Sequence, residues 1–289
     1  MGGPATQWSI GECHTRGLAE GPAGFLGITQ LTLWNLTGGG QVSCTAQARH
    51  NDSILVGGEA PKSPVQLGFQ APGDLLRAVI EHQGVPFLVA LDADGSTGVS
   101  INQKSLLQLI DTSQRSVVQT RQLERPANSL TVLDSGKRII VSHTDGTLSV
   151  LSTPQLDWIH QYVPLLGRAG SIHGVQVRAV PGKPRFLSRS DGGLLIQQFE
   201  VDTLRPHGPP LRHQRGVHWF CADDTFLFSI DQTEDSPGTL RVWSLRTGRE
   251  IVPGLHHPAP LLWASILNQG SRIATADASG TVRRWVLEH

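Results

Sequence analysis

The chain has 289 residues, and its 24 Lys and Arg residues balance its 24 Asp and Glu residues, so the formal net charge is zero. This balance argues against a protein that coats nucleic acid, and no apolar run approaches the roughly 18 residues of a membrane span. Hydrophobic residues make up 38% of the chain, and 32 Gly with 18 Pro predict a folded protein of short strands and many turns.

Seven segments of about 41 residues come into register when the chain is aligned with itself. Each contains a short β-rich run, a turn, and a second run that ends in an aromatic or aliphatic residue. These end residues are Trp34, Phe69, Ile110, Leu151, Phe199, Trp243 and Trp285. The predicted units are 11–44, 45–83, 84–124, 125–165, 166–212, 213–256 and 257–289, and they leave no room for a second domain.

One unit illustrates the predicted strands. Phe87 to Leu91 alternates toward an Asp-Gly turn, and further runs follow at Gly98 to Ile101, Leu106 to Ile110 and Ser116 to Gln119. Four short strands separated by turn residues form a small antiparallel sheet. Such a sheet cannot bury both of its faces alone, so we expect an all-β fold in which seven four-stranded sheets stack around an axis.

The segment from Pro154 to Gly167 has an alternative reading. Its Leu156, Ile159, Val163 and Leu166 fall at helical spacing, which would favour a helix. Pro164 and the repeat register favour a strand instead.

The later units resemble WD-repeat β-propellers. The resemblance rests on residues 275–285 (TADASGTVRRW), 238–244 (GTLRVWS) and 143–148 (HTDGTL), which are similar to the family's Asp-Gly-Thr and Val-x-x-Trp-Asp stretch. Residues 203–213 (TLRPHGPPLRH) and 247–260 (TGREIVPGLHHPAP) are similar to bacterial WD-repeat modules. Such modules are often parts of larger proteins with a kinase domain, but this sequence carries no kinase motif.

The resemblance also implies how each sheet is held. In the family, a turn Asp, a loop His, a strand Ser or Thr and the Trp can form a hydrogen-bonded tetrad. Here we expect only partial sets, such as His213 with Trp243, and mainly apolar packing. The structural residues of the units are Trp34, Asp145, Asp191, His213, Trp243 and Trp285. The family also implies that an N-terminal strand, 5–10 (ATQWSI), completes the last sheet and closes the ring.

The sequence offers no diagnostic catalytic or cofactor motif. It has no G-x-S-x-G, P-loop, GxGxxG, HExxH or kinase Asp-Phe-Gly. Asp92 to Gly95 begins like a calcium loop, but its twelfth position is Gln103, so a plain turn is the better interpretation. Cys13, Cys44 and Cys221 form no CxxC pair, which predicts neither a disulfide framework nor a zinc site. We therefore expect no metal, no cofactor and no catalysis.

Histidines and arginines gather at the junctions between units. We interpret His213 and His256 as structural residues. The functional hypothesis is a positively charged, anion-binding rim around the channel mouth on one propeller face. It is formed by Arg125, Arg168, Arg212, Arg215 and His257. Asp145, Asp191, Glu234 and Asp277 should lie on the same face and partly cancel its charge.

Two aromatic residues and one insertion are further candidates for a partner-binding surface. Trp219 and Trp263 occupy matching first strands and are interpreted as core residues rather than an exposed platform. The acidic insertion from Gln232 to Pro237 could carry specificity or be a tolerated loop.

Two functions remain open. The favoured one is a non-catalytic, cytoplasmic and monomeric scaffold that binds a protein or peptide on one face, without nucleic acid or membrane partners. The alternative is an enzyme or a small-ligand site at the mouth of the central channel.

Overall fold

A computed structural model covers residues 1–289. The structure describes all of them except 1–7, 10–14, 22–23, 30–31, 36–40, 44–45, 51–52, 59–65, 71–77, 82–85, 93–95, 112, 115, 165–174, 191–192, 232–236, 268–271, 280 and 287–289. Before residue 88 it gives the backbone of the strands and no side chains. Among the described residues, no helix is long and apolar enough to cross a membrane.

The described residues form seven four-stranded antiparallel sheets. The strands of the first three sheets are β2 (Thr15–Gly21), β3 (Gly24–Thr29), β4 (Thr32–Asn35) and β5 (Gln41–Ser43); β6 (Ala46–His50), β7 (Ser53–Gly58), β8 (Gln66–Gln70) and β9 (Ala78–Glu81); and β10 (Pro86–Leu91), β11 (Thr97–Asn102), β12 (Leu106–Asp111) and β13 (Ser116–Gln122).

Three more sheets follow, and each again consists of four consecutive strands. They are β14 (Ala127–Leu133), β15 (Arg138–His143), β16 (Thr147–Ser152) and β17 (Asp157–Pro164); β18 (Gln176–Ala179), β19 (Arg185–Ser190), β20 (Leu195–Glu200) and β21 (Pro206–Arg212); and β22 (Val217–Ala222), β23 (Phe226–Asp231), β24 (Thr239–Ser244) and β25 (Leu255–His256). Every run of four strands lies inside one of the predicted units.

The last sheet combines the two ends of the described chain. It contains β26 (Leu261–Leu267), β27 (Arg272–Asp277) and β28 (Thr281–Val286), and β1 (Trp8–Ser9) is its fourth strand. Trp8 pairs with Val282 and Ser9 pairs with Thr281, in antiparallel register. These two residues fall within the segment 5–10 that was expected to complete the last sheet.

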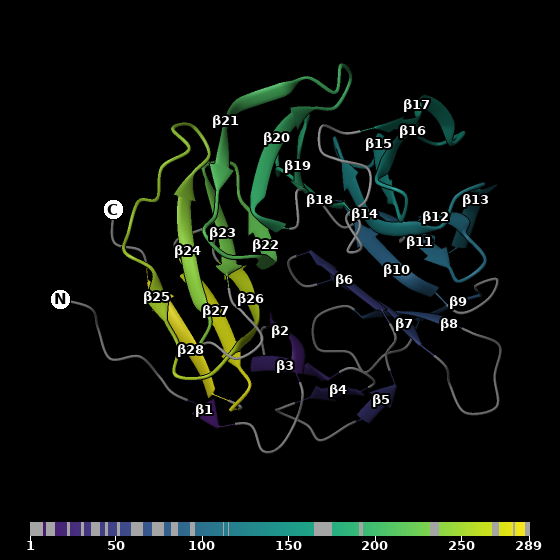
Figure 1. Cartoon of the computed structure of the whole chain (residues 1–289). Coiled ribbons are helices and arrows are strands. Elements are labelled where there is room, and N and C mark those ends of the chain that lie inside the picture. The colour runs from purple at the N-terminus through teal and green to yellow at the C-terminus, as the bar shows by residue number, and fades with distance from the viewer. Residues whose placement is uncertain are drawn as a thin grey trace.

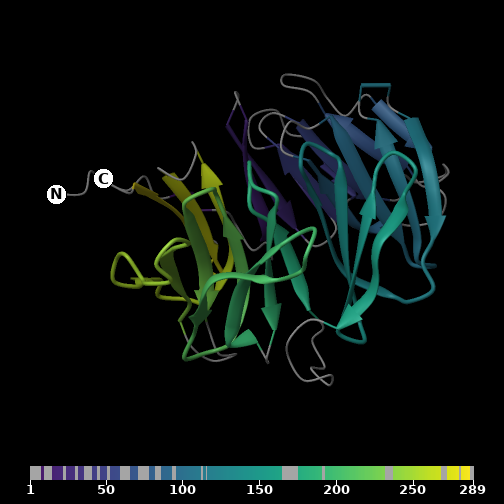
Figure 2. The same cartoon turned by 90° about the horizontal axis from the view of Figure 1, so that it is seen from above.

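The sheets are arranged around a common centre, with the first strand of each sheet innermost and the fourth outside (Figure 1). The first strands contact one another in the order β6, β10, β14, β18, β22 and β26, and β26 contacts β2. In the view turned by 90°, the strands run between two ends of the molecule where the loops lie (Figure 2). Side chains on loops of the same end are therefore brought together from sheets far apart in sequence.

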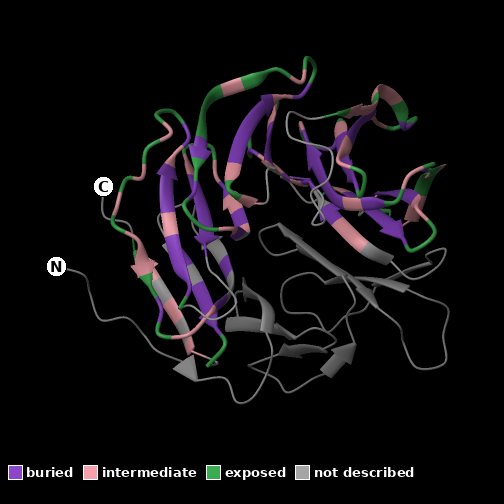
Figure 3. Ribbon diagram, in the orientation of Figure 1, coloured by how far each residue is buried: buried purple, intermediate pink, exposed green. Residues whose placement is uncertain are grey.

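The core lies between neighbouring sheets and is built mainly from their middle strands (Figure 3). In β15 and β16 almost every residue is buried, whereas the outer strands β13, β17 and β21 are largely exposed or half-buried. Both faces of a middle strand are covered by adjacent sheets, so it reads as an apolar run rather than an alternating one. Ser142 and Ser188, expected at close sheet contacts, are both buried.

The strand predictions that fall on described residues agree with the structure. The sheet containing β10 to β13 begins and ends within a few residues of the expected runs. The segment with helical spacing forms strand β17, as Pro164 and the repeat register favoured. Leu156 lies in the preceding turn, with φ of 61°, and is fully buried. Helical spacing arose here because a turn residue and an outer strand both contribute apolar side chains to the core.

Candidate interaction face

One end of the molecule, called the loop face here, is formed by the described segments 103–105, 123–126, 144–146, 193–194, 211–216, 237–238, 256–260 and 278–279. It contains the loops that connect one sheet to the next and the turns between the second and third strands. These two kinds of segment bond to each other: the amides of Thr144 and Ala278 donate to Pro126 O at 3.1 Å and Pro260 O at 2.8 Å. The loop face is thus tied together by backbone bonds.

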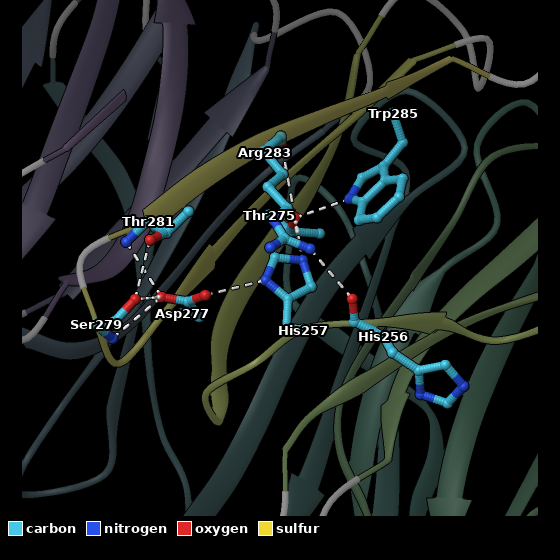
Figure 4. A network of polar contacts seen from close by, with 8 residues as sticks. All are labelled: His256, His257, Thr275, Asp277, Ser279, Thr281, Arg283 and Trp285. Atoms are coloured by element: carbon cyan, nitrogen blue, oxygen red, sulfur yellow. Dashed lines mark hydrogen bonds and ion pairs between the residues drawn. The ribbon is translucent and has the colours of Figure 1, made fainter. Parts of the chain in front are cut away.

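The last sheet holds a complete hydrogen-bonded tetrad (Figure 4). Trp285 Nε1 donates to Thr275 Oγ1 at 2.9 Å, and Thr275 Oγ1 lies 2.9 Å from His257 Nε2. His257 Nδ1 lies 3.2 Å from Asp277 Oδ2. Because a carboxylate only accepts, His257 donates to Asp277 through Nδ1, and its Nε2 accepts from Thr275. The expectation that only partial sets remain is therefore wrong for this sheet.

Asp277 also fixes the turn at its own end of the sheet. Its Oδ1 accepts from Ser279 N at 3.0 Å, Ser279 Oγ at 2.5 Å and Thr281 N at 3.1 Å. Burial alone would raise the pKa of Asp277, but hydrogen bonds from Ser279, His257 and Thr281 hold it below its ordinary value. Burial lowers the pKa of His257, so this imidazole is neutral at pH 7.

The sheet of β22 to β25 has a modified version of this tetrad. Trp243 Nε1 donates to Ser229 Oγ at 2.9 Å, and the same oxygen lies 2.9 Å from His213 Nε2. Asp231, at the position of Asp277, is paired with Arg241 Nε at 2.5 Å rather than with the histidine. Burial lowers the pKa of His213 to about 4. The predicted pairing of His213 with Trp243 is confirmed.

The sheet of β14 to β17 replaces most of the tetrad by apolar residues. Leu123 precedes β14 by four residues, as His213 precedes β22 and His257 precedes β26. Leu123, Val141 and Leu151 occupy the positions of His257, Thr275 and Trp285, and all three are buried in one cluster. His143 takes the position of Asp277, and its Nε2 lies 2.9 Å from Ser149 Oγ. This sheet is fastened by packing, as expected for most units.

Arg125 lies on the loop face with half of its side chain accessible. Its Nη1 is 2.5 Å from Asp145 Oδ2, and the side chains are 40% and 43% exposed. The guanidinium also stacks over the ring of Tyr162, with Cζ 4.3 Å from the centroid. Asp145 therefore cancels the charge of Arg125, as the sequence suggested for this face, and lies at the turn rather than in a tetrad.

The structure separates the other predicted rim residues. Arg212 and Arg215 are exposed on the loop face and have no ion-pair partner among the described residues. His257 is only 2% exposed and belongs to the tetrad, so its prediction as an accessible rim residue is wrong. His256, the expected structural histidine, is instead exposed and bonds Thr239 Oγ1 through Nδ1 at 3.1 Å. Arg168, Asp191 and Glu234 lie outside the described residues, as does the side chain of Trp34.

The other candidate residues, where the structure describes them, have structural rather than binding roles. Asp92 is 1% exposed, and its carboxylate accepts from Ser96 Oγ and from the amide of Thr97, as in a plain turn. No group of three or more His, Cys, Asp or Glu side chains that could hold a metal occurs in the described part of the chain. Trp219 packs against the core between the last two sheets. The side chain of Trp263 and the insertion 232–236 are not among the described residues.

Two features escaped the sequence reasoning. The tetrad histidine could have been found by counting four residues back from each first strand, a spacing that selects His257 over His256. Arg178 and Arg189 had no such signal. Arg178 lies against the next sheet, where its Cζ is 5.9 Å from the centroid of Phe220.

Comparison with known proteins identifies the fold. No protein-family model matches the chain, and no curated protein is similar in sequence. Among solved structures, the β-propeller domain of Cps50 (Swd1) from Myceliophteria thermophila gives a TM-score of 0.70 at 11% identity, covering 98% of this chain and 100% of that one. BamB from Moraxella catarrhalis gives 0.61 at 12% identity, covering 98% of both chains. The computationally designed Ika8 protein gives 0.65 at 13% identity, covering 94% of this chain and 83% of that one.

These likenesses concern the fold alone, since identities of 11 to 13% carry no shared activity. They support an all-β protein of four-stranded antiparallel sheets whose structural neighbours include a β-propeller.

Proposed function

We propose that the chain is a seven-bladed propeller of the WD-repeat type, closed by β1, and that it is a non-catalytic scaffold for protein partners. In this proposal a peptide or protein domain binds the loop face. A cytoplasmic location, a monomeric state and the lack of nucleic-acid or membrane partners remain predictions of the sequence.

The observation that carries the proposal is the contrast between the interior and the loop face. In three sheets the same positions hold a complete tetrad, a modified tetrad or the apolar set at Leu123, Val141 and Leu151, and all of these residues except half-buried Trp285 are buried. The exposed side chains of the loops differ from sheet to sheet and include Arg125, Arg212 and Arg215. A uniform rigid frame that presents variable loop residues is the arrangement expected of a recognition surface. Neighbours with a propeller fold make the same function plausible.

Affinity capture from native lysate tests this proposal. The purified chain is compared with a loop-face variant carrying Arg125→Glu, Arg212→Glu and Arg215→Glu. A matched control carries Lys183→Glu, Arg246→Glu and Arg249→Glu, which reverse three exposed charges at the opposite end of the molecule. Circular dichroism establishes that all three proteins are folded.

The proposal predicts at least one protein that is retained by the parent and the control and lost from the loop-face variant. A protein retained equally by all three would place binding elsewhere. If no protein is retained, the scaffold function fails and a small-ligand propeller becomes the better hypothesis.

A further inference from the structure

Charge is unevenly distributed over the described part of the loop face. Arg125 is neutralised by Asp145, and the turn of the last sheet holds the carboxylate of Asp277. The loop between β21 and β22 is different. Arg215 lies in this loop and Arg212 is the last residue of β21, and both are exposed and without an ion-pair partner among the described residues.

Two further arginines lie beneath this loop. Arg189 Nη1 donates to the carbonyl oxygen of Val217, the first residue after the loop. Arg189 pairs with Gln176 across β18 and β19, and Arg178 follows on the same face of β18, two residues further on. Burial, and then the neighbouring charge of Arg178, lower the pKa of Arg189. Two guanidinium groups thus approach each other where the first strands meet the loop face.

Arg178 is held by weak acceptors. Its Nη1 donates to the carbonyl oxygen of Val177 at 3.0 Å, and its guanidinium lies over Phe220. No carboxylate pairs with it among the described residues, and burial lowers its pKa. A partly buried cation is destabilising unless an opposite charge compensates it. A bound anion would supply this compensation.

We infer that Arg178, Arg189, Arg212 and Arg215, here called the arginine sector, bind an acidic segment of a protein partner, an inference that rests on the proposed scaffold function. Guanidinium groups match carboxylates through paired hydrogen bonds, which a glutamate- or aspartate-rich peptide supplies at intervals along its chain. Two of the arginines are exposed and capture the segment at the surface. The two beneath them are partly buried and add positive charge below the captured segment.

Nucleic acid fits this sector less well than an acidic peptide. A phosphodiester backbone is bound by an extended track of cations, with affinity drawn from many phosphate contacts. Here the four arginines lie on β18, on β19, at the end of β21 and in the loop that follows it. The neighbouring Arg125 is neutralised by Asp145 and does not extend the sector into a track of cations. A short acidic segment matches this compact arrangement.

The test measures fluorescence anisotropy of a short fluorescein-labelled oligo-glutamate peptide at low ionic strength. The first variant carries Arg212→Gln and Arg215→Gln, two exposed changes that leave the core intact. The control carries Arg246→Gln and Arg249→Gln, which remove the same charge from exposed sites at the opposite end. We expect the affinity to fall about fivefold in the first variant, the size expected for two exposed charge pairs, and by less than about twofold in the control.

A third variant, Arg178→Gln, tests the deeper part of the sector. Its loss of affinity should exceed that of either exposed arginine changed singly, because water screens a partly buried charge less. Equal losses in the first variant and its control would overturn the inference, as would tighter binding of an oligothymidylate of the same net charge.

The outcome is distinguishable from that of the scaffold proposal. If a protein is captured from lysate but Arg212→Gln with Arg215→Gln leaves its binding unchanged, the scaffold stands and the arginine sector is refuted. If oligo-glutamate binds through the sector and no protein is captured, the sector binds carboxylates but the scaffold function is refuted, and with it a protein partner for the sector.

Discussion

Thr275 is the central residue of the complete tetrad, because its hydroxyl forms hydrogen bonds with both Trp285 and His257. Oγ1 accepts from Trp285 Nε1 and donates to His257 Nε2, each at 2.9 Å. Thr275 and His257 are both buried, with 0% and 2% of their surface exposed. The change Thr275→Val keeps the shape of the side chain and removes only the hydroxyl, so it isolates the hydrogen bonds of this hydroxyl, which include a longer contact with Arg283 O at 3.4 Å.

The expected magnitude follows from the two groups left without a partner. A buried polar atom that loses its hydrogen bond costs about 1 to 3 kcal/mol. His257 Nε2 bears this cost in full, whereas half-buried Trp285 can turn its N–H toward water. We therefore expect Thr275→Val to lower the free energy of unfolding by about 3 kcal/mol. Thr275→Ser retains the hydroxyl and loses one buried methyl, which costs about 1 kcal/mol.

Chemical denaturation followed by tryptophan fluorescence measures both variants. The decisive comparison is their order: the serine variant should be more stable than the valine variant by about 2 kcal/mol, although serine is the smaller residue. Trp285→Phe removes the indole N–H that donates to the Thr275 hydroxyl. The losses of unfolding free energy in Trp285→Phe and in Thr275→Val should therefore sum to more than the loss in the double variant. A valine variant as stable as the serine variant would refute the hydrogen-bonded account of this sheet.

Three further predictions concern stability. Because the pKa of His213 is lowered to about 4, the fold favours the neutral imidazole. Its contribution to the free energy of unfolding is complete above about pH 6.5 and should fall by about 3 kcal/mol as the pH drops from 6.5 to 4. Denaturation measured across this range should show a smaller pH dependence for His213→Gln. Leu123→Ala should cost about 2 to 4 kcal/mol because it opens a cavity in an apolar cluster, and a loss below about 1 kcal/mol in thermal unfolding would contradict the assignment of Leu123 to the tetrad-like position. Gly136 has φ of +86°, and a Cβ there would lie 2.4 Å from Thr97 Oγ1, so Gly136→Ala should destabilise by about 2 kcal/mol in the same assay, whereas Ser135→Ala, at an exposed neighbour, should change stability by less than about 1 kcal/mol.

The repeated units could be read from the sequence because each short sheet reuses one pattern of strands and turns. Periodicity predicted the four strands of the sheet around Val99 to Gln119 within a few residues, and Pro164 favoured a strand over a helix at β17. The pattern of strands and turns depends on local composition, which a single sequence displays directly. The pairing of β1 with β28 was expected from the resemblance to WD-repeat propellers.

The site was less predictable because charge and burial depend on partners that are distant in sequence. His256 and His257 are adjacent, yet one is exposed and the other is buried against Thr275. Asp145 was expected on the same face as Arg125, but only the fold shows that the two form an ion pair and that Arg125 stacks on Tyr162. The contact of Arg178 with Phe220 joins two neighbouring sheets, and no residue pattern within one unit indicates it. Strand periodicity indicates which residues share a face but not what that face meets.

Hydrogen–deuterium exchange with a captured partner tests most directly whether the loop face is a protein-binding surface. Amide exchange of the chain is measured with and without a saturating amount of the partner. The account predicts protection in segments 123–126, 144–147, 211–217 and 256–260, which lie at the loop face in several different sheets. Protection confined to segments 134–137, 181–184 and 245–250, at the opposite end, would contradict it.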